Sequence, residues 1–446
     1  MTFSRRGALA LVGGLASLAA CGSSDKSSQG ATTDGAGKTL SVFFSANPQN
    51  PQEQKIWFQQ MSDDFKKGTG ATVQFETYNN SSDAVTRLQT SVVSGRGPDV
   101  FGLNTTLTPT AYATGGFVKL GAKEWAAIGG REKFGTPSLG LSGPNDANQV
   151  GVPFSTRPYV LAYNKDLLKA AGIASPAQTW DELADQAKQL TKDGTFGLAV
   201  AYKDPLDPWK FIWAMSNQAG NPLLKDGQAT LDDPAVNKAY ETYFGWLTKG
   251  HAVDPASVGW ANPQAVAAFA AGKAAYLPLA TNALRPTLDK SSVAGKYGFA
   301  LMPTVPPGAT QRPAGGVEAA SILSGQNLVL ADYSQNKALA LTFVKMITDE
   351  KVQSDYFKSF GEIPNNLAAA KAMSQDDPLV RVSVEAQNKM SPTPFSGAWA
   401  DVQASLANVV VQSIPDLNSG GVTADNLKSR LAAAQKTAQD AASRAK

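Results

Sequence analysis

The chain has 446 residues, with 40 Lys or Arg, 37 Asp or Glu, one His and one Cys. Its length predicts two or three domains, and its composition is that of a folded protein. The charges nearly cancel and no basic run exceeds a short pair, which argues against nucleic-acid binding. One His and one Cys leave too few ligands for a Cys/His zinc site and offer no catalytic Cys–His motif, so no metal or cofactor is expected.

Residues 1–20 have the layout of a signal peptide. Two arginines precede an apolar stretch over residues 8–20, which is shorter than the roughly 20 residues of a membrane span. Leu18-Ala19-Ala20-Cys21 matches the lipobox of bacterial lipoproteins, so we expect cleavage before Cys21 and a lipid on its thiol. An ordinary secretory signal is the alternative. Ser4-Arg5-Arg6 resembles a twin-arginine export signal, although Ala8 replaces the usual Phe.

Residues 21–37 contain no apolar side chain larger than Ala and predict a flexible tether. A lipid followed by a tether places the folded body outside the cytoplasm, anchored to the outer face of the bacterial cell membrane. The chain has no second cysteine, so the body folds without disulfides.

Strands and helices alternate along the first part of the body. Buried-strand patterns cover residues 40–44, 71–78 and 98–103, and helical spacing covers 53–67 and 83–94. This alternation predicts an α/β fold with a largely parallel sheet covered on both faces. Ligands of such sheets bind beyond the carboxyl ends of the strands.

A second unit begins near Val150. Thr179 and Glu182 form a capping box at the start of one of its helices. Further strands are expected at residues 157–164, 196–200, 274–279 and 297–302, and further helices at 209–219, 263–272, 336–348, 350–360 and from 380 onward. The last third is therefore mostly helical.

Several segments, taken in order, resemble the family 1 extracellular solute-binding proteins, which are the maltose-binding-protein-like receptors of ABC importers. The resemblance covers residues 38–446. The similar stretches are Ser94–Val100, Gly115–Leu120, Gly151–Phe154, Leu161–Leu168, Thr179–Leu183, Phe269–Ala275, Gly315–Ile322, Ala338–Phe343 and Gly361–Pro364.

This resemblance implies a two-lobe periplasmic-binding-protein-like fold with discontinuous lobes and a central ligand cleft. The N-terminal lobe is expected to comprise residues 38–151 and 304–360, and the C-terminal lobe residues 152–303 and 361–446. The crossings between them are expected near residues 150–155, 302–310 and 360–364. The implied cycle is hinge closure of a monomer around a solute, followed by delivery to a membrane permease.

A sugar presents hydroxyl groups around an apolar ring face, so a sugar site combines aromatic platforms with polar side chains. The aromatic candidates are Tyr159, Trp209, Trp260 and Trp399, and core packing is the alternative for each. By the resemblance, Tyr159 and Trp399 occupy places where the family often has cleft residues. The other tryptophans considered, Trp57, Trp125, Trp180 and Trp246, are expected in the core, and His251 at the surface.

The polar candidates follow predicted strands or lie in loops, and a solvated loop residue is the alternative for each. Arg157 is compatible with either an ion pair or a contact to sugar hydroxyls. The set consists of Asn47, Asn79, Asn104, Thr105, Arg157, Asn282, Arg285 and Glu318.

These features favour an extracytoplasmic lipoprotein that captures a mono- or oligosaccharide for an ABC importer. The first alternative is the same fold with a non-sugar solute. A polyamine would need several cleft carboxylates, whereas the strand-end loops carry Asn and Thr; a glycerol phosphodiester also stays open. The second alternative is a secreted glycoside-acting enzyme, which would need two carboxylates about 5 Å or 6.5–9.5 Å apart. No local pair is apparent, and no catalytic residue is assigned.

Overall fold

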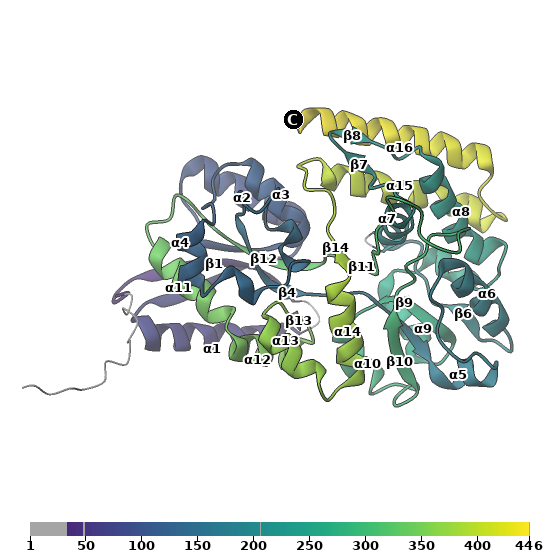
Figure 1. The fold of residues 1–446 in the computed structure, drawn as a ribbon, viewed down its shortest axis with the longest axis horizontal. Coiled ribbons are helices and arrows are strands. Elements are labelled where there is room, and N and C mark those ends of the chain that lie inside the picture. The colour runs from purple at the N-terminus through teal and green to yellow at the C-terminus, as the bar shows by residue number, and fades with distance from the viewer. Residues whose placement is uncertain (1–33, 48–49, 206, 446) are drawn as a thin grey trace, which may run out of the picture.

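The computed structural model describes residues 34–47, 50–205 and 207–445. The predicted signal peptide, Cys21 and most of the tether lie outside these ranges. Two sheets, each with its own helices, form two lobes that lie side by side (Figure 1). Within the described ranges, no helix combines the length and apolarity needed to cross a membrane.

The first lobe contains a six-stranded sheet in the order β13-β4-β12-β3-β1-β2. β1 pairs in parallel with β2 and β3, whereas β12 is antiparallel to β3 and β4. The ends of β1 to β4 and the start of β12 therefore share one edge, from which the chain crosses to the second lobe. The strands are β1 (Thr39–Ser45), β2 (Thr72–Tyr78), β3 (Val100–Asn104), β4 (Gly151–Thr156), β12 (Gly325–Leu330) and β13 (Ile363–Pro364).

Helices cover both faces of this sheet because successive strand residues point to opposite sides. Phe43 belongs to one apolar core and Phe44 to the other. Trp57, Met61 and Phe65 lie at helical spacing on the buried side of α1. The helices are α1 (Pro51–Thr69), α2 (Ser81–Ser94), α3 (Thr108–Ala113), α4 (Ala122–Ile128), α11 (Lys337–Ile347), α12 (Glu350–Phe360) and α13 (Leu367–Ser374), with 3₁₀ turns η1 (Thr105–Leu107), η2 (Arg131–Lys133) and η3 (Ser138–Leu141).

The second lobe contains a four-stranded sheet in the order β10-β5-β9-β6. Its strands are β5 (Val160–Asn164), β6 (Phe196–Leu198), β9 (Ala274–Ala280) and β10 (Tyr297–Leu301). Two short pairs accompany it: β7 (Leu224–Lys225) with β8 (Gln228–Ala229), and β11 (Ser321–Ile322) with β14 (Met390–Ser391).

The remaining helices surround this second sheet or extend to the C-terminus (Figure 1). α14 packs against β10, and α15 packs against α16 and α7. These helices are α5 (Lys165–Ala170), α6 (Trp180–Leu190), α7 (Pro208–Gln218), α8 (Pro234–Thr248), α9 (Asn262–Ala270), α10 (Arg285–Leu288), α14 (Pro378–Asn388), α15 (Trp399–Asn418) and α16 (Ala424–Arg444), with 3₁₀ turns η4 (Pro255–Gly259) and η5 (Asn282–Leu284).

Several local predictions are confirmed. The Thr179 hydroxyl accepts the Glu182 backbone N–H, and the Glu182 carboxylate accepts the Thr179 N–H, which completes the capping box. His251 is exposed, and the four tryptophans expected in the core are buried, namely Trp57, Trp125, Trp180 and Trp246. The helices α3, α4, α8 and α13 and the strands β4 and β12 were not predicted.

The first crossing lies later than expected. The strand predicted over residues 157–164 begins only at Val160 as β5, and residues 151–156 form a separate strand, β4, which pairs with β12 and β13 in the first sheet. Val160 is the first residue to pair with β9 and β10 in the second sheet. The chain therefore crosses at residues 157–159, and the predicted crossing at 150–155 falls almost entirely within β4.

The other two crossings also differ from the predicted positions. Thr304 donates to the Gln178 carbonyl and Ala319 belongs to the second-lobe core, so residues 304–320 stay with the second lobe. The chain re-enters the first sheet at Gly325. β13 pairs with β4, and α13 contacts α12, so the last return lies beyond the expected 360–364. Strand pairing over long sequence separations sets these boundaries, and local patterns do not report it.

Two glycine substitutions test the packing of the first lobe. A Cβ at Gly102 in β3 would lie 2.5 Å from the ring of Phe44, so Gly102→Ala should lower the free energy of unfolding by about 1–3 kcal/mol. A Cβ at Gly68 in α1 would have no heavy atom within 4 Å, so Gly68→Ala should raise the free energy of unfolding by up to about 1 kcal/mol. Urea unfolding of both variants measures the difference, and equal stabilities would contradict this packing.

Candidate ligand-binding cleft

An ion pair with a buried carboxylate connects the first crossing to the residue that precedes β13. The Glu362 side chain is 3% exposed, and its Oε1 accepts from Arg157 Nη2 at 2.6 Å and from Arg157 Nε at 2.8 Å. The Ser155 hydroxyl donates to the other carboxylate oxygen. The Glu362 carboxylate raises the pKa of Arg157 above its ordinary value, so the guanidinium stays charged. Of the two interpretations of Arg157, the structure contains the ion pair.

Beside this ion pair, both lobes and two crossings enclose a cavity of about 190 Å³, here called the central cleft. Asn104, Thr105 and Thr106 contribute from the first lobe, and Trp209, Lys210 and Gln403 from the second. The crossings supply Arg157, Tyr159 and residues 322–325. The structure thus brings together five of the predicted residues, which are Asn104, Thr105, Arg157, Tyr159 and Trp209.

Lys210 fixes the aromatic wall of the central cleft. Its Nζ lies 4.6 Å from the centroid of the Tyr159 ring and donates to Asp207 Oδ1 at 2.9 Å. The Lys210 and Asp207 side chains are only 12% and 13% exposed. Burial alone would lower the pKa of Lys210, but Tyr159 and Asp207 outweigh it and raise that pKa above its ordinary value. The ammonium therefore remains charged beneath the ring.

Trp399 lies behind the central cleft rather than in its wall. It is 1% exposed, and its ring meets that of Trp209 edge to face, with centroids 6.1 Å apart. Neither indole N–H has a hydrogen-bond partner among the described residues. Trp399 therefore supports Trp209, and the residue of α15 that lines the cleft is Gln403, about one turn further along.

A second inter-lobe cavity of about 640 Å³, the seam cavity, holds two more predicted residues. It is lined by Asn50 and residues 357–361 from the first lobe, and by residues near Asn282 and Arg285 from the second. Asn282 Nδ2 donates to the Gly361 carbonyl at 3.1 Å, which joins η5 of the second lobe to the end of α12 in the first. Arg285 Nη1 lies 2.6 Å from Asp377 Oδ2, so its charge is already neutralised.

The other predicted residues lie outside both inter-lobe cavities. Asn47 Oδ1 accepts the backbone N–H of Asn50 at the loop before α1. Asn79 is exposed. Glu318 forms ion pairs with Lys389 and Arg312, as a surface residue does. Trp260 lines a separate cavity made only of second-lobe residues.

The sequence analysis missed several residues of the central cleft. Lys210 directly follows Trp209, and Thr106 follows the predicted pair Asn104 and Thr105. Their place next to predicted residues in the sequence could therefore have identified them. Residues 322–325 precede a buried strand that was not assigned. Nothing local distinguishes Gln403. Among the described residues, no group of three or more His, Cys, Asp or Glu could hold a metal ion.

This chain is similar in sequence and in fold to several known proteins. The chain is 28% identical to the diacetylchitobiose binding protein DasA of Streptomyces coelicolor. The alignment spans 411 residues and covers 89% of each chain. The sugar-binding protein MalE from Xanthomonas citri superposes with a TM-score of 0.75 at 17% identity, covering 91% of this chain and 98% of that one.

A solute-binding protein from Thermotoga lettingae, solved with α-D-tagatose, superposes with a TM-score of 0.71 at 19% identity over 91% of this chain and all of that one. These superpositions extend over both lobes and establish the two-lobe fold. Residues 50–354 match the family model described as bacterial extracellular solute-binding protein. That match spans well over half of the sequence, and the chain therefore belongs to the bacterial extracellular solute-binding protein family.

Proposed function

We propose that this protein is the receptor of an ABC importer and that it captures a neutral mono- or oligosaccharide in the central cleft. The observation that carries the proposal is the charge balance of the cleft wall. Arg157 is paired with Glu362 and Lys210 with Asp207, and no Asp or Glu is among the described residues that line the cavity. A charged solute would find no free counter-charge there, whereas hydroxyl groups would meet Asn, Thr, Ser and Gln side chains.

The similar proteins support a sugar as the solute. DasA is named for diacetylchitobiose, and the Thermotoga protein was solved with α-D-tagatose. Trp209 and Tyr159 give the central cleft the aromatic surface on which the apolar face of a pyranose packs.

Closure follows from where the cleft residues are anchored. Asn104 and Thr105 move with the first lobe, while Trp209 and Gln403 move with the second. A solute that contacts both sets stabilises the closed state by contacts that the open state lacks. The crossing at residues 157–159 and the one ending at Gly325 would act as the hinge.

The proposal includes no chemical turnover of the solute. Glycoside hydrolysis uses two carboxyl groups that flank the scissile bond. Of the carboxylates bonded to the cleft wall, Asp207 is paired with Lys210, and Glu362 is buried and bonded to Arg157 and Ser155. It is therefore held as a structural anion.

The anchor and the partners complete the proposal. Cys21 would carry the lipid, a signal of the twin-arginine type would export the chain, and the tether would let a monomeric body reach the permease. The predicted lipobox Leu18–Cys21 supports this arrangement.

Ligand binding is expected to raise the melting temperature and to compact the protein. The full chain is screened by thermal shift against glucose, maltose, N,N′-diacetylchitobiose, spermidine and glycerophosphocholine, since saturation at about 100 times Kd adds about 2.7 kcal/mol. Scattering with the best sugar should show a smaller radius of gyration, and the sugar should be recovered unaltered. A shift with spermidine alone, or a hydrolysed sugar, would overturn the proposal.

Substitutions of two nearby tyrosines distinguish an effect on sugar binding from an effect on stability. Tyr159 and Tyr163 are both half-buried, but only Tyr159 lines the central cleft. Tyr159→Ala should raise the Kd for the sugar about 10- to 100-fold, since it removes a contact surface. Tyr163→Ala should change Kd less than about twofold. Titration calorimetry measures both constants, and equal effects would show that the cleft wall is not the binding surface.

The anchor is tested by Cys21→Ala. Without the thiol, the folded body should leave the membrane fraction or remain as uncleaved precursor, because the lipid has no attachment point. Membrane fractionation with mass determination of the N-terminus gives the result. Normal processing with full membrane retention would contradict lipid attachment at Cys21.

A further inference from the structure

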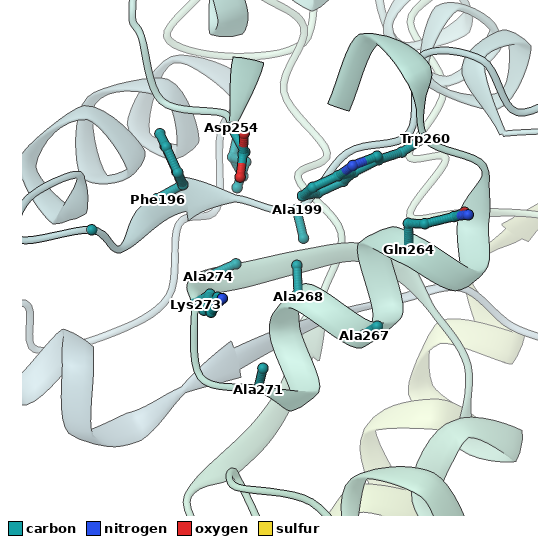
Figure 2. Close-up of a pocket in the computed structure, with 12 residues that line it drawn as sticks. Phe196, Ala199, Asp254, Trp260, Gln264, Ala267, Ala268, Ala271, Lys273 and Ala274 are labelled. Atoms are coloured by element: carbon teal, nitrogen blue, oxygen red, sulfur yellow. The ribbon is translucent and has the colours of Figure 1, made fainter. Parts of the chain in front are cut away.

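Trp260 differs from every other tryptophan of the chain. All eight lie in the described ranges; seven are at most 6% exposed, and Trp260 alone is partly exposed. It borders a cavity of about 430 Å³, here called the α9 pocket (Figure 2). Every lining residue belongs to the second lobe; none lines the central cleft, and Ala267 alone also lines the seam cavity.

Small side chains create the α9 pocket. Ala267, Ala268 and Ala271 face it from α9 and the turn that follows, and the short edge strand β6 borders the other side with Phe196. Larger residues at these alanines would fill the space. Figure 2 shows Trp260 and Asp254 on one side of the pocket, with Lys273 and the alanines opposite. Backbone hydrogen bonds to Ser257 and Lys203 hold Trp260 in place.

The polar groups at the rim are available to a ligand. One Asp254 oxygen accepts the Ala256 N–H, and the other has no hydrogen-bond partner among the residues that the structure describes. Within the described chain, neither Asp254 nor Lys273 forms an ion pair. One anion and one cation give the rim no net charge, so a charged ligand would be attracted by one group and repelled by the other. Hydroxyl groups satisfy both, because they donate to the carboxylate and accept from the ammonium.

We propose that the α9 pocket is a second carbohydrate site, in which a pyranose ring stacks on the Trp260 indole and directs hydroxyl groups to Asp254 and Lys273. Because the site lies within one lobe, a sugar occupies it equally in the open and closed states. A single ring on a single platform binds weakly, with a Kd on the order of 1 mM. This inference goes beyond the proposed function, which concerns the central cleft alone.

The test uses fluorine NMR of the full chain labelled with 5-fluorotryptophan. Trp260→Phe identifies the Trp260 resonance, and the probes are methyl β-D-glucopyranoside and N,N′-diacetylchitobiose. The Trp260 resonance should shift with a Kd on the order of 1 mM. Ala268→Leu, which fills the pocket, should raise that Kd at least about tenfold. Ala432→Leu, at an exposed position of α16, should leave it unchanged.

Three results would overturn the second site. The first is a Trp260 resonance that does not shift at up to about 100 mM of either sugar. The second is a Trp260 resonance with the same concentration dependence as the Trp209 resonance, and the third is one that shifts with benzyl alcohol and not with sugars. Failure of the proposed function is distinguishable, because it appears as an unshifted Trp209 resonance and an unchanged radius of gyration. The Trp260 titration is independent of both.

Discussion

The buried carboxylate of Glu362 is the constraint on which the arrangement of the lobes depends. A charge that is 3% exposed must be paired, and its partners are Ser155 of β4 and Arg157 of the first crossing. Directly beside it, Ile363 pairs with Thr156 in the sheet, and Gln387 donates to both Thr156 and the Pro364 carbonyl. The first crossing is thereby fixed to β13 of the first lobe and to α14 of the second, and we expect relative motion of the lobes to occur as rotation about this point.

The need to pair a buried charge also determines the chemistry of the central cleft. Lys210 is buried in the wall because Asp207 neutralises it, and Asp207 is in turn held by the Asn262 amide at 2.7 Å. This network joins α7 to α9 and leaves the charges satisfied within the protein. What remains for a solute is a neutral set of amides, hydroxyls and rings. The selectivity for an uncharged ligand that we propose would thus be a consequence of how the protein stabilises its own buried charges.

Local patterns predicted most of the longer strands and helices and the core tryptophans, because periodicity and capping act over a few residues, but they left β4 and β12 unassigned. They also placed Asn104 and Thr105 at the cleft, since parallel strands end at one sheet edge. Interactions across the chain were out of reach: Arg157 and Glu362 are 205 positions apart. The burial of Trp399 depends on Trp209, and the crossings depend on the antiparallel pairing of β12 with β4. No residue near these positions in sequence signals those partners.

Where an aromatic residue lies relative to the crossings decides what its contacts can do. Trp209 shares the central cleft with first-lobe residues, so a ring packed on it gains contacts when the lobes approach. Trp260 shares its pocket only with its own lobe, and contacts made there are the same in both states. A ligand with equal affinity for two states shifts nothing between them, however tightly it binds. Under the proposed function, only the central cleft could therefore convert sugar binding into closure, whatever aromatic surface the second lobe exposes elsewhere.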